Sequence, residues 1–472
     1  MAFIFDKNAP LDLTSLTRLY RSGGLTPGAL VAGLIERLAA RGDDHVWIYR
    51  IPDADLMARA AALEKAGPEG LPLYGIPFAI KDNMDVAGLT TTAGCPAYAY
   101  VPDETAPAIA RLIDAGAILV GKANLDQFAT GLVGVRTPYG IPGNSFDPSY
   151  VPGGSSAGSA VAVAAGLVSF SLGTDTAGSG RVPAAFNNIV GLKPTRGLLS
   201  CRGVVPACRS LDCISIFALT SADAAAVLDV AGAYDPGDAF SRRAPAEFSL
   251  GLEPSPAAFR FGVPRPDQLE FFGNGDAAAL FDAAVERMEG LGGRKTVIDF
   301  APFQDTARLL YDGPWVDERR AAVGDFIADN EAETHPVTRQ IILKGKSYSA
   351  VDAYRAYYRL RELKQQTEPL WDDIDVLFTP TAGTIYSIAE VEADPIRLNA
   401  NLGYYTNYMN LLDLSAVAVP AGLLSNGLPF GVTLAAPAYC EQRLLALADA
   451  AHRATGLPMG ATGLPLPPAD PD

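Results

Sequence analysis

The chain has 472 residues, of which 49% are hydrophobic and 19% are charged, an ordinary composition for a globular protein. Its formal net charge of −16 would repel a polyanion, and Lys and Arg form no long run, so direct nucleic-acid binding is not expected. No stretch of about 18 uninterrupted apolar residues is present, and no membrane span is predicted. Because the charge offers no long-range attraction to a small anion, an anionic substrate would need a specific local arginine.

The N-terminus and the cysteines bear on the cellular compartment. Residues 1–7 reach charge at Asp6 and Lys7 before any apolar signal-peptide core, so export is not expected. The five cysteines are odd in number and include no CxxC pair, which supports neither a zinc site nor a disulfide framework. We predict a cytoplasmic protein with reduced thiols.

The first quarter of the chain alternates between helical and strand-like patterns. Thr26 is placed to cap a helix over 27–42, and Thr105 is placed to cap another helix that runs to Gly116. The apolar run 117–120 then has the length and composition of a buried strand. This alternation predicts an α/β protein with a largely covered sheet.

The rest of the chain changes character twice. Residues 131–215 are rich in Gly, Ser, Thr and Pro but contain apolar runs, which indicates catalytic loops on a scaffold. Residues 265–370 show helical patterns, after which 375–378, 415–419 and 431–434 are strand-like again. This order predicts a helical insertion within one sheet domain.

Two serine-rich turns, 153–159 and 173–181, carry the strongest chemical signal in the sequence. The segment between them reads as a compact helical run over 160–165 followed by a strand over 168–172. A helix and a strand of these lengths would fold the second turn back beside the first. We therefore expect one serine hydroxyl from each turn to meet.

A serine hydroxyl is a weak nucleophile and needs a nearby base, usually histidine. None of the three histidines lies in or beside a glycine-rich turn, whereas Lys81 ends the apolar run 74–80. Desolvation lowers the pKa of a lysine, so its neutral amine could accept a proton relayed from Ser179 through Ser155. The backbone N–H groups of four consecutive residues could form the oxyanion hole: Thr176, Ala177, Gly178 and Ser179.

Simpler interpretations compete with this one. A Gly-Gly-Ser-Ser turn is often only a helix-capping loop, and a single lysine is often only a structural charge. A phosphate cradle is disfavoured because neither turn has a Gly-Lys-Ser/Thr ending. Residues 154–158 also match G-x-S-x-G, which would make Ser156 the nucleophile. That motif needs a strand leading into the serine, and Pro142, Pro148 and Pro152 disfavour one.

These motifs carry a family resemblance. The sequence resembles the amidase signature family in blocks that follow one another in family order: 75–83, 153–159, 173–179, 181–186, 191–194 and 427–431. The resemblance covers nearly the whole chain. It implies the α/β amidase signature fold, a mixed twisted β-sheet covered by α-helices on both faces. It further implies one domain over 1–472, with the helical insertion at about 265–370.

The resemblance also implies residue roles and no metal or organic cofactor. The residues that it places in the catalytic triad are the nucleophile Ser179, the bridging serine Ser155 in a cis peptide, and the general base Lys81. Asp175 and Arg181 correspond to a supporting polar network. Ala177 departs from the pattern, because many relatives have glycine there.

Within the family, the sequence is most similar to the allophanate hydrolases, in four blocks: 130–136, 187–188, 198–203 and 310–319. By that resemblance Tyr311 and Arg319, with Gly131 in the substrate site, hold the carboxylate of a small anionic amide. The implied reaction hydrolyses the terminal amide of urea-1-carboxylate and releases ammonia. The residues alone favour a different interpretation, in which Arg319 is a helix-surface arginine paired with Glu318 or Asp317.

Other functions stay open at this point. A general small-amide amidase, or the A subunit of a tRNA amidotransferase with its partner subunits, would share the triad. A noncatalytic binding protein that kept the fold is a more remote alternative. The resemblance suggests a homodimer, and we expect the chain to lack the further C-terminal domain that full-length allophanate hydrolases carry.

Overall fold

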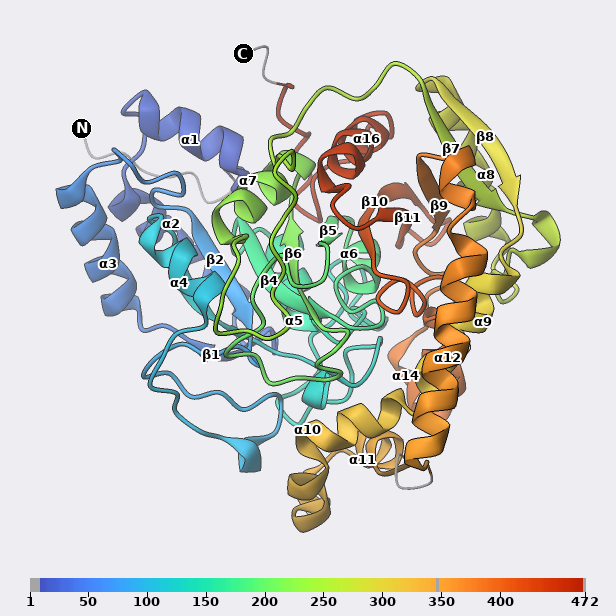
Figure 1. The fold of residues 1–472 in the computed structure, drawn as a ribbon. Coiled ribbons are helices and arrows are strands. Elements are labelled where there is room, and N and C mark those ends of the chain that lie inside the picture. Colours follow the sequence, from blue (N-terminus) through green and yellow to red (C-terminus); the bar gives the residue numbers. More distant parts are fainter. Residues whose placement is uncertain (1–8, 345–347, 470–472) are drawn as a thin grey trace.

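The computed structural model describes residues 9–344 and 348–469 and is built around one 11-stranded mixed sheet (Figure 1). The strands follow one another across the sheet in the order β1-β3-β2-β4-β6-β5-β10-β11-β9-β7-β8. Their bounds are β1 Trp47–Arg50, β2 Pro77–Lys81, β3 Ile118–Ala123, β4 Phe170–Asp175, β5 Val190–Lys193, β6 Cys213–Ala218, β7 Phe259–Pro264, β8 Gly293–Ile298, β9 Val376–Pro380, β10 Leu414–Leu423 and β11 Pro429–Pro437. Residues 1–7, on which the prediction about export rests, lie outside the described residues.

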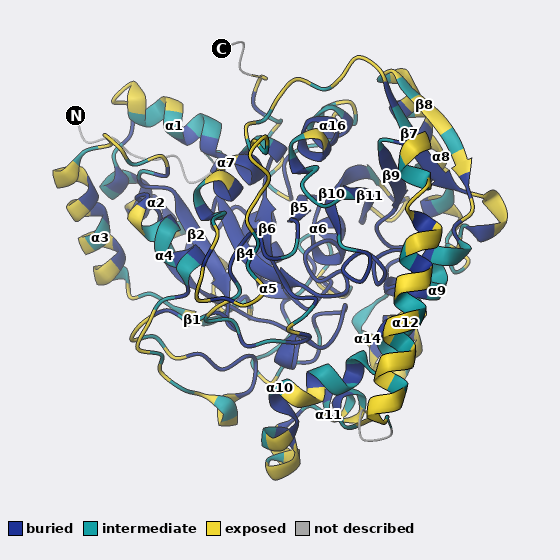
Figure 2. Cartoon of the chain, in the orientation of Figure 1, coloured by how far each residue is buried: buried dark blue, intermediate teal, exposed yellow. Residues whose placement is uncertain are grey.

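Helices cover the sheet on both faces, so its central strands are buried (Figure 2). The α-helices are α1 Leu13–Arg21, α2 Pro27–Arg41, α3 Asp53–Ala66, α4 Pro107–Asp114, α5 Ala157–Ala164, α6 Val182–Phe186, α7 Ser221–Ala231, α8 Gly275–Gly290, α9 Ala301–Asp312, α10 Trp315–Asp329, α11 Pro336–Leu343, α12 Ala350–Thr367, α13 Leu370–Asp373, α14 Ile388–Ala393, α15 Arg397–Leu402 and α16 Glu441–Arg453. Among the described residues, no helix is both long and apolar enough to cross a membrane. The predicted mixed α/β sheet with helices on both faces is confirmed.

Two strand pairings matter for the site. Strand β2 pairs in parallel with β3 on one side and with β4 on the other, with Ile80 opposite Leu172. The carboxyl ends of parallel strands lie at the same edge of a sheet, which is where ligands bind in many α/β proteins. The residues that follow β2 and β4 are therefore brought together.

Local sequence signals succeeded in one predicted helix and failed in another. Helix α2 begins as expected, with Pro27 in its first turn and the Thr26 side chain accepting a hydrogen bond from the N–H of Ala29. The prediction for Thr105 was wrong. Its hydroxyl oxygen accepts the N–H of Ala87 (3.0 Å), and α4 begins at Pro107 without a side-chain cap. The N-cap position of α4 is occupied by Ala106, whose side chain has no hydrogen-bond acceptor.

The stretch 265–370 is not purely helical. Strand β8 lies inside it and pairs in parallel with β7 at an edge of the sheet. Its residues include the exposed Arg294 and Lys295, so it lacks the apolar run that marks a buried strand. The segment between the two serine-rich turns is shifted by a few residues but has the predicted order, with α5 followed by β4.

Candidate active site

The three residues predicted to form the triad lie at the carboxyl edge of β2 and β4. Lys81 is the last residue of β2, Ser155 lies in the loop before α5, and Ser179 lies in the turn after β4. All three are buried, and Ser179 has 3% of its surface exposed. The structure therefore places residues from three separate segments at one edge of the sheet.

Lys81 has the environment of a base. Its Nζ donates to the hydroxyl oxygens of Ser155 and Thr174, each at 2.7 Å. Burial lowers its pKa from 10.5 to about 7, although Asp126 and other nearby carboxylates oppose that shift. The next buried lysine, Lys122, forms an ion pair with Asp82 at 2.9 Å, whereas Lys81 forms no such pair among the described residues. A substantial share of Lys81 is therefore neutral near neutral pH.

Ser155 is held by the backbone around it. The Gly154–Ser155 peptide bond is cis, as the family resemblance implied. The carbonyl oxygen of Ser155 accepts the N–H of Asp126 (3.0 Å), and a side chain at Gly154 would collide with the Asp126 carboxylate. Glycine is thus required for this close approach.

The hydroxyl of Ser179 donates to the carbonyl oxygen of Gly131 at 3.5 Å. Among the described residues it forms no hydrogen bond with Ser155. The step from Ser155 to Lys81 is therefore hydrogen bonded, and the step from Ser179 to Ser155 is not. Hydrogen bonds in catalytic sites without a ligand are often long and shorten when substrate binds.

Asp175 and Arg181 fix the turn that carries Ser179. The Arg181 guanidinium binds both carboxylate oxygens of Asp175, at 2.8 and 2.9 Å, and both side chains are fully buried. The N–H groups of Gly178 and Gly180 also donate to this carboxylate, at 2.9 and 3.0 Å. Burial alone would raise the pKa of Asp175, but Arg181 and Lys193 turn the net shift downward. Gly178 therefore differs from the other predicted oxyanion donors, because its N–H is bound within the protein.

Replacing Asp175 with asparagine is expected to reduce the free energy of unfolding by about 3–5 kcal/mol, because the buried Arg181 would lose its partner. Chemical denaturation measures this change. Asp317→Asn is the matched control, since Asp317 pairs with Arg320 at 3.5 Å on the partly exposed face of α10. That loss should stay below about 1 kcal/mol. Equal losses in the two variants would contradict the stabilising role of the buried pair.

A second buried carboxylate touches the same turn. The hydroxyl of Thr176 donates to Asp212, which also accepts the N–H groups of Ala207 and Cys208. Burial raises the pKa of Asp212 to about 6. Asp212 directly precedes β6, whose first residue pairs with Asp175. Asp212 therefore ties the turn that carries Ser179 to the neighbouring strand β6.

Arg319 is not the surface residue that its sequence context allowed. It is 1% exposed, and its Nη1 donates to the Thr130 hydroxyl (3.1 Å) and more weakly to the carbonyl of Ala129 (3.4 Å). Its Nη2 donates to the hydroxyl oxygen of Tyr311 (3.3 Å), and its guanidinium carbon lies 5.4 Å from that ring's centre. Glu318 accepts hydrogen bonds from Ser210 instead. The structure therefore brings Tyr311 and Arg319 together, as expected.

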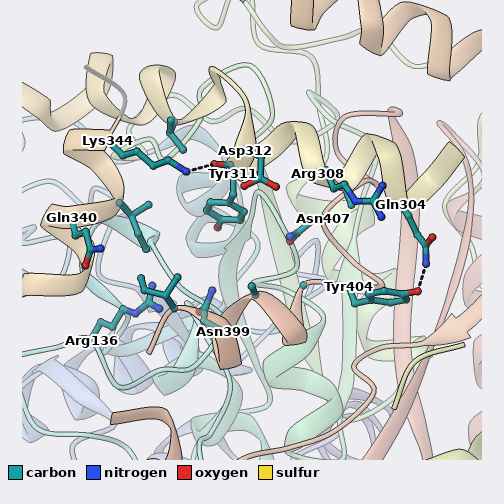
Figure 3. Close-up of a pocket in the computed structure, with 16 residues that line it drawn as sticks. Arg136, Gln304, Arg308, Tyr311, Asp312, Gln340, Lys344, Asn399, Tyr404 and Asn407 are labelled. Carbon is teal, nitrogen blue, oxygen red and sulfur yellow. Dashed lines mark hydrogen bonds between the residues drawn. The ribbon is translucent and has the colours of Figure 1, made fainter. Parts of the chain in front are cut away.

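A cavity of about 470 Å³ lies beside this pair (Figure 3). Tyr311, Arg136, Asn399 and Asn407 all line it, and α9, α10, α11 and α15 supply most of its wall. It has room for a small polar ligand. Ser179 and Lys81 do not line the cavity itself.

The loop 130–136 connects the cavity with the predicted triad. The Asp126 carboxylate accepts the backbone N–H groups of Gly134 (3.0 Å) and Arg136 (2.9 Å), which fixes the path of the loop. A side chain at Gly131 would lie 2.5 Å from Asp126 Oδ2. Gly131 can therefore present its carbonyl to Ser179 only because it has no side chain.

Sequence reasoning missed several residues of the site. Thr174, Asp126 and Asp212 each bind a residue of the predicted machinery, but none of them lies in a recognisable motif of its own. The available signal was position: Thr174 lies within the second serine-rich segment, 173–181, although no role was assigned to it, and Asp212 precedes an apolar strand. In the described parts of the chain, no group of three or more His, Cys, Asp or Glu is arranged to hold a metal, and the cysteines are unpaired.

The fold and the motifs define the class as the amide hydrolases. A family model described as Amidase matches residues 29–445, and the chain belongs to that family. This confirms the family that the glycine- and serine-rich blocks predicted.

Several relatives are more specific. The urea amidolyase of Lachancea kluyveri is 44% identical over 420 residues, which cover 88% of this chain but 23% of that protein. The A component of the glutamyl-tRNA(Gln) amidotransferase of Deinococcus deserti is 36% identical over 93% of this chain and 95% of its own length. The solved allophanate hydrolase of Kluyveromyces lactis superposes with a TM-score of 0.88 at 42% identity, covering 94% of this chain and 73% of that one. This chain thus spans less than a quarter of the urea amidolyase.

Proposed function

We propose that this protein is an allophanate hydrolase, which cleaves the terminal amide of urea-1-carboxylate. The observation that carries the proposal is Arg319, a fully buried guanidinium without a carboxylate partner among the described residues, next to Tyr311. An unpaired buried charge is costly, and a ligand carboxylate would offset that cost. The identity with proteins named urea amidolyase and allophanate hydrolase supports the same choice.

In the proposed mechanism Ser179 attacks the terminal amide carbonyl, and Ser155 relays its proton to the neutral amine of Lys81. The N–H groups of Thr176, Ala177 and Ser179 stabilise the oxyanion, and each such donor typically contributes about 2.7–4 kcal/mol. Ammonia leaves with a proton returned from Lys81. Water then attacks the acyl-enzyme by the same proton route and releases Ser179.

The substrate carboxylate binds to Arg319 and Tyr311, at the far end from the amide that reacts. This contact sets specificity, because a carboxylate and a guanidinium form charge-assisted hydrogen bonds that an uncharged amide cannot replace. Thr130 links the two ends of the site, since it touches Arg319 and precedes Gly131, which contacts Ser179.

Two other functions would use the same triad. A general amidase would prefer uncharged amides, and the glutaminase-like component of an amidotransferase would need its partner chains for activity. The first measurement is therefore ammonia release by the isolated chain from allophanate, biuret and malonamide. Strong preference for allophanate would support the proposal, and preference for malonamide would contradict it.

Arg319→Ala is expected to reduce kcat/KM for allophanate by about a hundredfold or more, and that for malonamide by less than about fivefold. Arg320→Ala is the matched control, because Arg320 is the next residue of α10 but pairs with Asp317 at a partly exposed position. It should leave both rates nearly unchanged. Equal losses for the two substrates in Arg319→Ala would remove Arg319 as the carboxylate-binding residue.

We further propose that the protein acts in the cytoplasm as a homodimer. The five unpaired cysteines support the first proposal, and the family resemblance supports the second. Size-exclusion chromatography with light scattering tests the oligomeric state.

A further inference from the structure

In the described part of the chain, three arginines are fully buried: Arg136, Arg181 and Arg319. Only Arg181 has a carboxylate partner, Asp175, within ion-pair distance among the described residues. Arg136 is held by carbonyl oxygens, with Nη1 donating to Thr130 (2.9 Å) and Nη2 donating to Pro395 (2.8 Å). Among the described residues, the Nε atoms of Arg136 and Arg319 are buried and have no hydrogen-bond partner.

The two guanidinium groups that lack a carboxylate partner in the described structure converge on one residue. Arg136 binds the carbonyl oxygen of Thr130, and Arg319 binds its hydroxyl. Arg136 also lines the 470 Å³ cavity together with Tyr311, and Figure 3 shows both around the same hollow. Burial lowers the pKa of Arg136, and the nearby charge of Arg319 lowers it further, as expected for two cations close together. The side chains of Asp126 and Tyr311 oppose this shift.

The loop 130–136, to which both arginines are hydrogen bonded at Thr130, connects them with the reacting end of the site. Arg136 Nη1 would lie 3.2 Å from a side-chain carbon placed on Gly131, and the Gly131 carbonyl accepts the Ser179 hydroxyl. Asp126 is the nearby carboxylate, but backbone N–H groups of the same loop already occupy its oxygens. Arg136 thus lines the cavity itself, and Arg319 is buried next to it, against Thr130 and the cavity residue Tyr311.

The proposed reaction produces a ligand that fits this charge. Water and urea-1-carboxylate, a monoanion, give the dianion N-carboxycarbamate and an ammonium ion. The bond from the carbonyl carbon to the terminal nitrogen breaks, and a bond from that carbon to the water oxygen forms. Both protons of the water end on the departing nitrogen, which leaves as ammonium. The organic product therefore carries one more negative charge than the substrate. The new charge appears at the reacting end, away from the carboxylate that Arg319 holds.

We propose that Arg136 binds the second carboxylate, the one that hydrolysis creates, so that Arg136 and Arg319 together form a site for a small dianion. This inference rests on the proposed function. The site would prefer the dicarboxylate product and its analogues over monoanionic analogues of the substrate, and product release would be sensitive to Arg136.

Binding in the full chain with Ser179→Ala, which prevents turnover, tests the proposal. The probes are malonate, which has a methylene group where the dianionic product has its nitrogen, and malonamate, which replaces the central nitrogen of the substrate in the same way. Calorimetry at about pH 8 and fixed ionic strength should show malonate binding at least about tenfold more tightly. If malonate and malonamate bound this protein with equal affinity, the proposed dianion site would be overturned, and no Arg136 variant would be needed to show it.

Variants then assign the second charge. Arg136→Met should weaken malonate by at least about tenfold and malonamate by less than about threefold, whereas Arg319→Met should weaken both. Arg308→Met is the control, because Arg308 also lines the cavity but pairs with Asp305 at 2.7 Å, and it should preserve the preference for malonate. Equal losses of both probes in Arg136→Met would overturn the proposal and leave Arg136 a structural residue.

The two hypotheses fail in different ways. If Arg319→Met weakened neither probe while Arg136→Met still weakened malonate selectively, the carboxylate contact in the proposed function would be wrong and the role of Arg136 would stand. If malonamate bound through Arg319 but malonate gained nothing from Arg136, the proposed function would stand and the dianion site would be wrong.

Discussion

Replacing Ser179 with alanine is expected to lower kcat for allophanate by at least about 10⁴-fold, because removing a nucleophile removes the acyl-enzyme route entirely. The fold should survive, since the one hydrogen bond that the Ser179 hydroxyl makes within the described residues is a long one, to the carbonyl of Gly131 at 3.5 Å. Ammonia release under single-turnover and steady-state conditions measures the loss. Substantial residual turnover in a folded Ser179→Ala protein would remove Ser179 as the nucleophile.

Ser156→Ala provides the matched control for that experiment. Ser156 is the serine of the G-x-S-x-G match, and it is fully buried one residue from Ser155. Its hydroxyl donates to the carbonyl of Thr174 (3.2 Å) and accepts that residue's N–H (3.3 Å). Both hydrogen bonds hold the backbone of β4, so the role of this hydroxyl is structural. We expect a small loss of stability and a far smaller loss of activity than in Ser179→Ala. The reverse ranking would favour the nucleophile-elbow interpretation.

Replacing Lys81 with methionine is expected to reduce kcat/KM by about 10³-fold or more, since general bases typically contribute about 10²–10⁴ and this one also organises Ser155. In the unmodified protein, kcat/KM should rise as pH increases through about 7, because the neutral amine is the reactive form and burial lowers the pKa of Lys81 to about 7. A pH–rate profile between about pH 5 and 9 tests this. A profile that is flat through pH 7 would contradict Lys81 as the base.

Stability gives an independent readout of the same group. The pKa of Lys81 lies near 7 in the folded protein and near 10.5 in the unfolded chain, so the unfolded chain binds more protons between these values. The free energy of unfolding contributed by Lys81 must therefore rise with pH over that window and level off above it. In Lys81→Met this contribution is absent, and the difference in unfolding free energy between the two proteins should change between about pH 7 and 10.

The parts of the site that depend on local chain geometry were predictable from sequence. Lys81 ends an apolar strand, and Ser155 and Ser179 lie in glycine-rich turns. Composition and order along the chain were enough to predict the hydrogen-bonded contact between Lys81 and Ser155, but Ser179 is not hydrogen bonded to Ser155 in the described structure. The sheet was predictable for the same reason, because β3, β9, β10 and β11 are apolar runs. Strand β8 was missed because a polar edge strand has no such run.

The residues that surround the triad could not be predicted in this way. Asp126 and Arg136 act through backbone groups of a loop whose path only the folded chain defines. Asp212 acts through Thr176, which is distant in sequence. The burial of Arg319 was also invisible, because its helix presents charged neighbours on both sides of it. Each of these contacts depends on tertiary packing, for which sequence spacing contains no local signal.

The strand order has a consequence for how the molecule assembles. Strands from residues 47–218 form one flank of the sheet and strands from residues 259–380 form the other, and only β10 and β11, residues 414–437, join the two. During synthesis, β5 in the first flank and β9 in the second each lack one neighbouring strand until the ribosome has released those late residues. The last hydrogen-bonded ladders therefore bridge segments that lie far apart in the chain, a topology of long loop closures that slows the final step of folding.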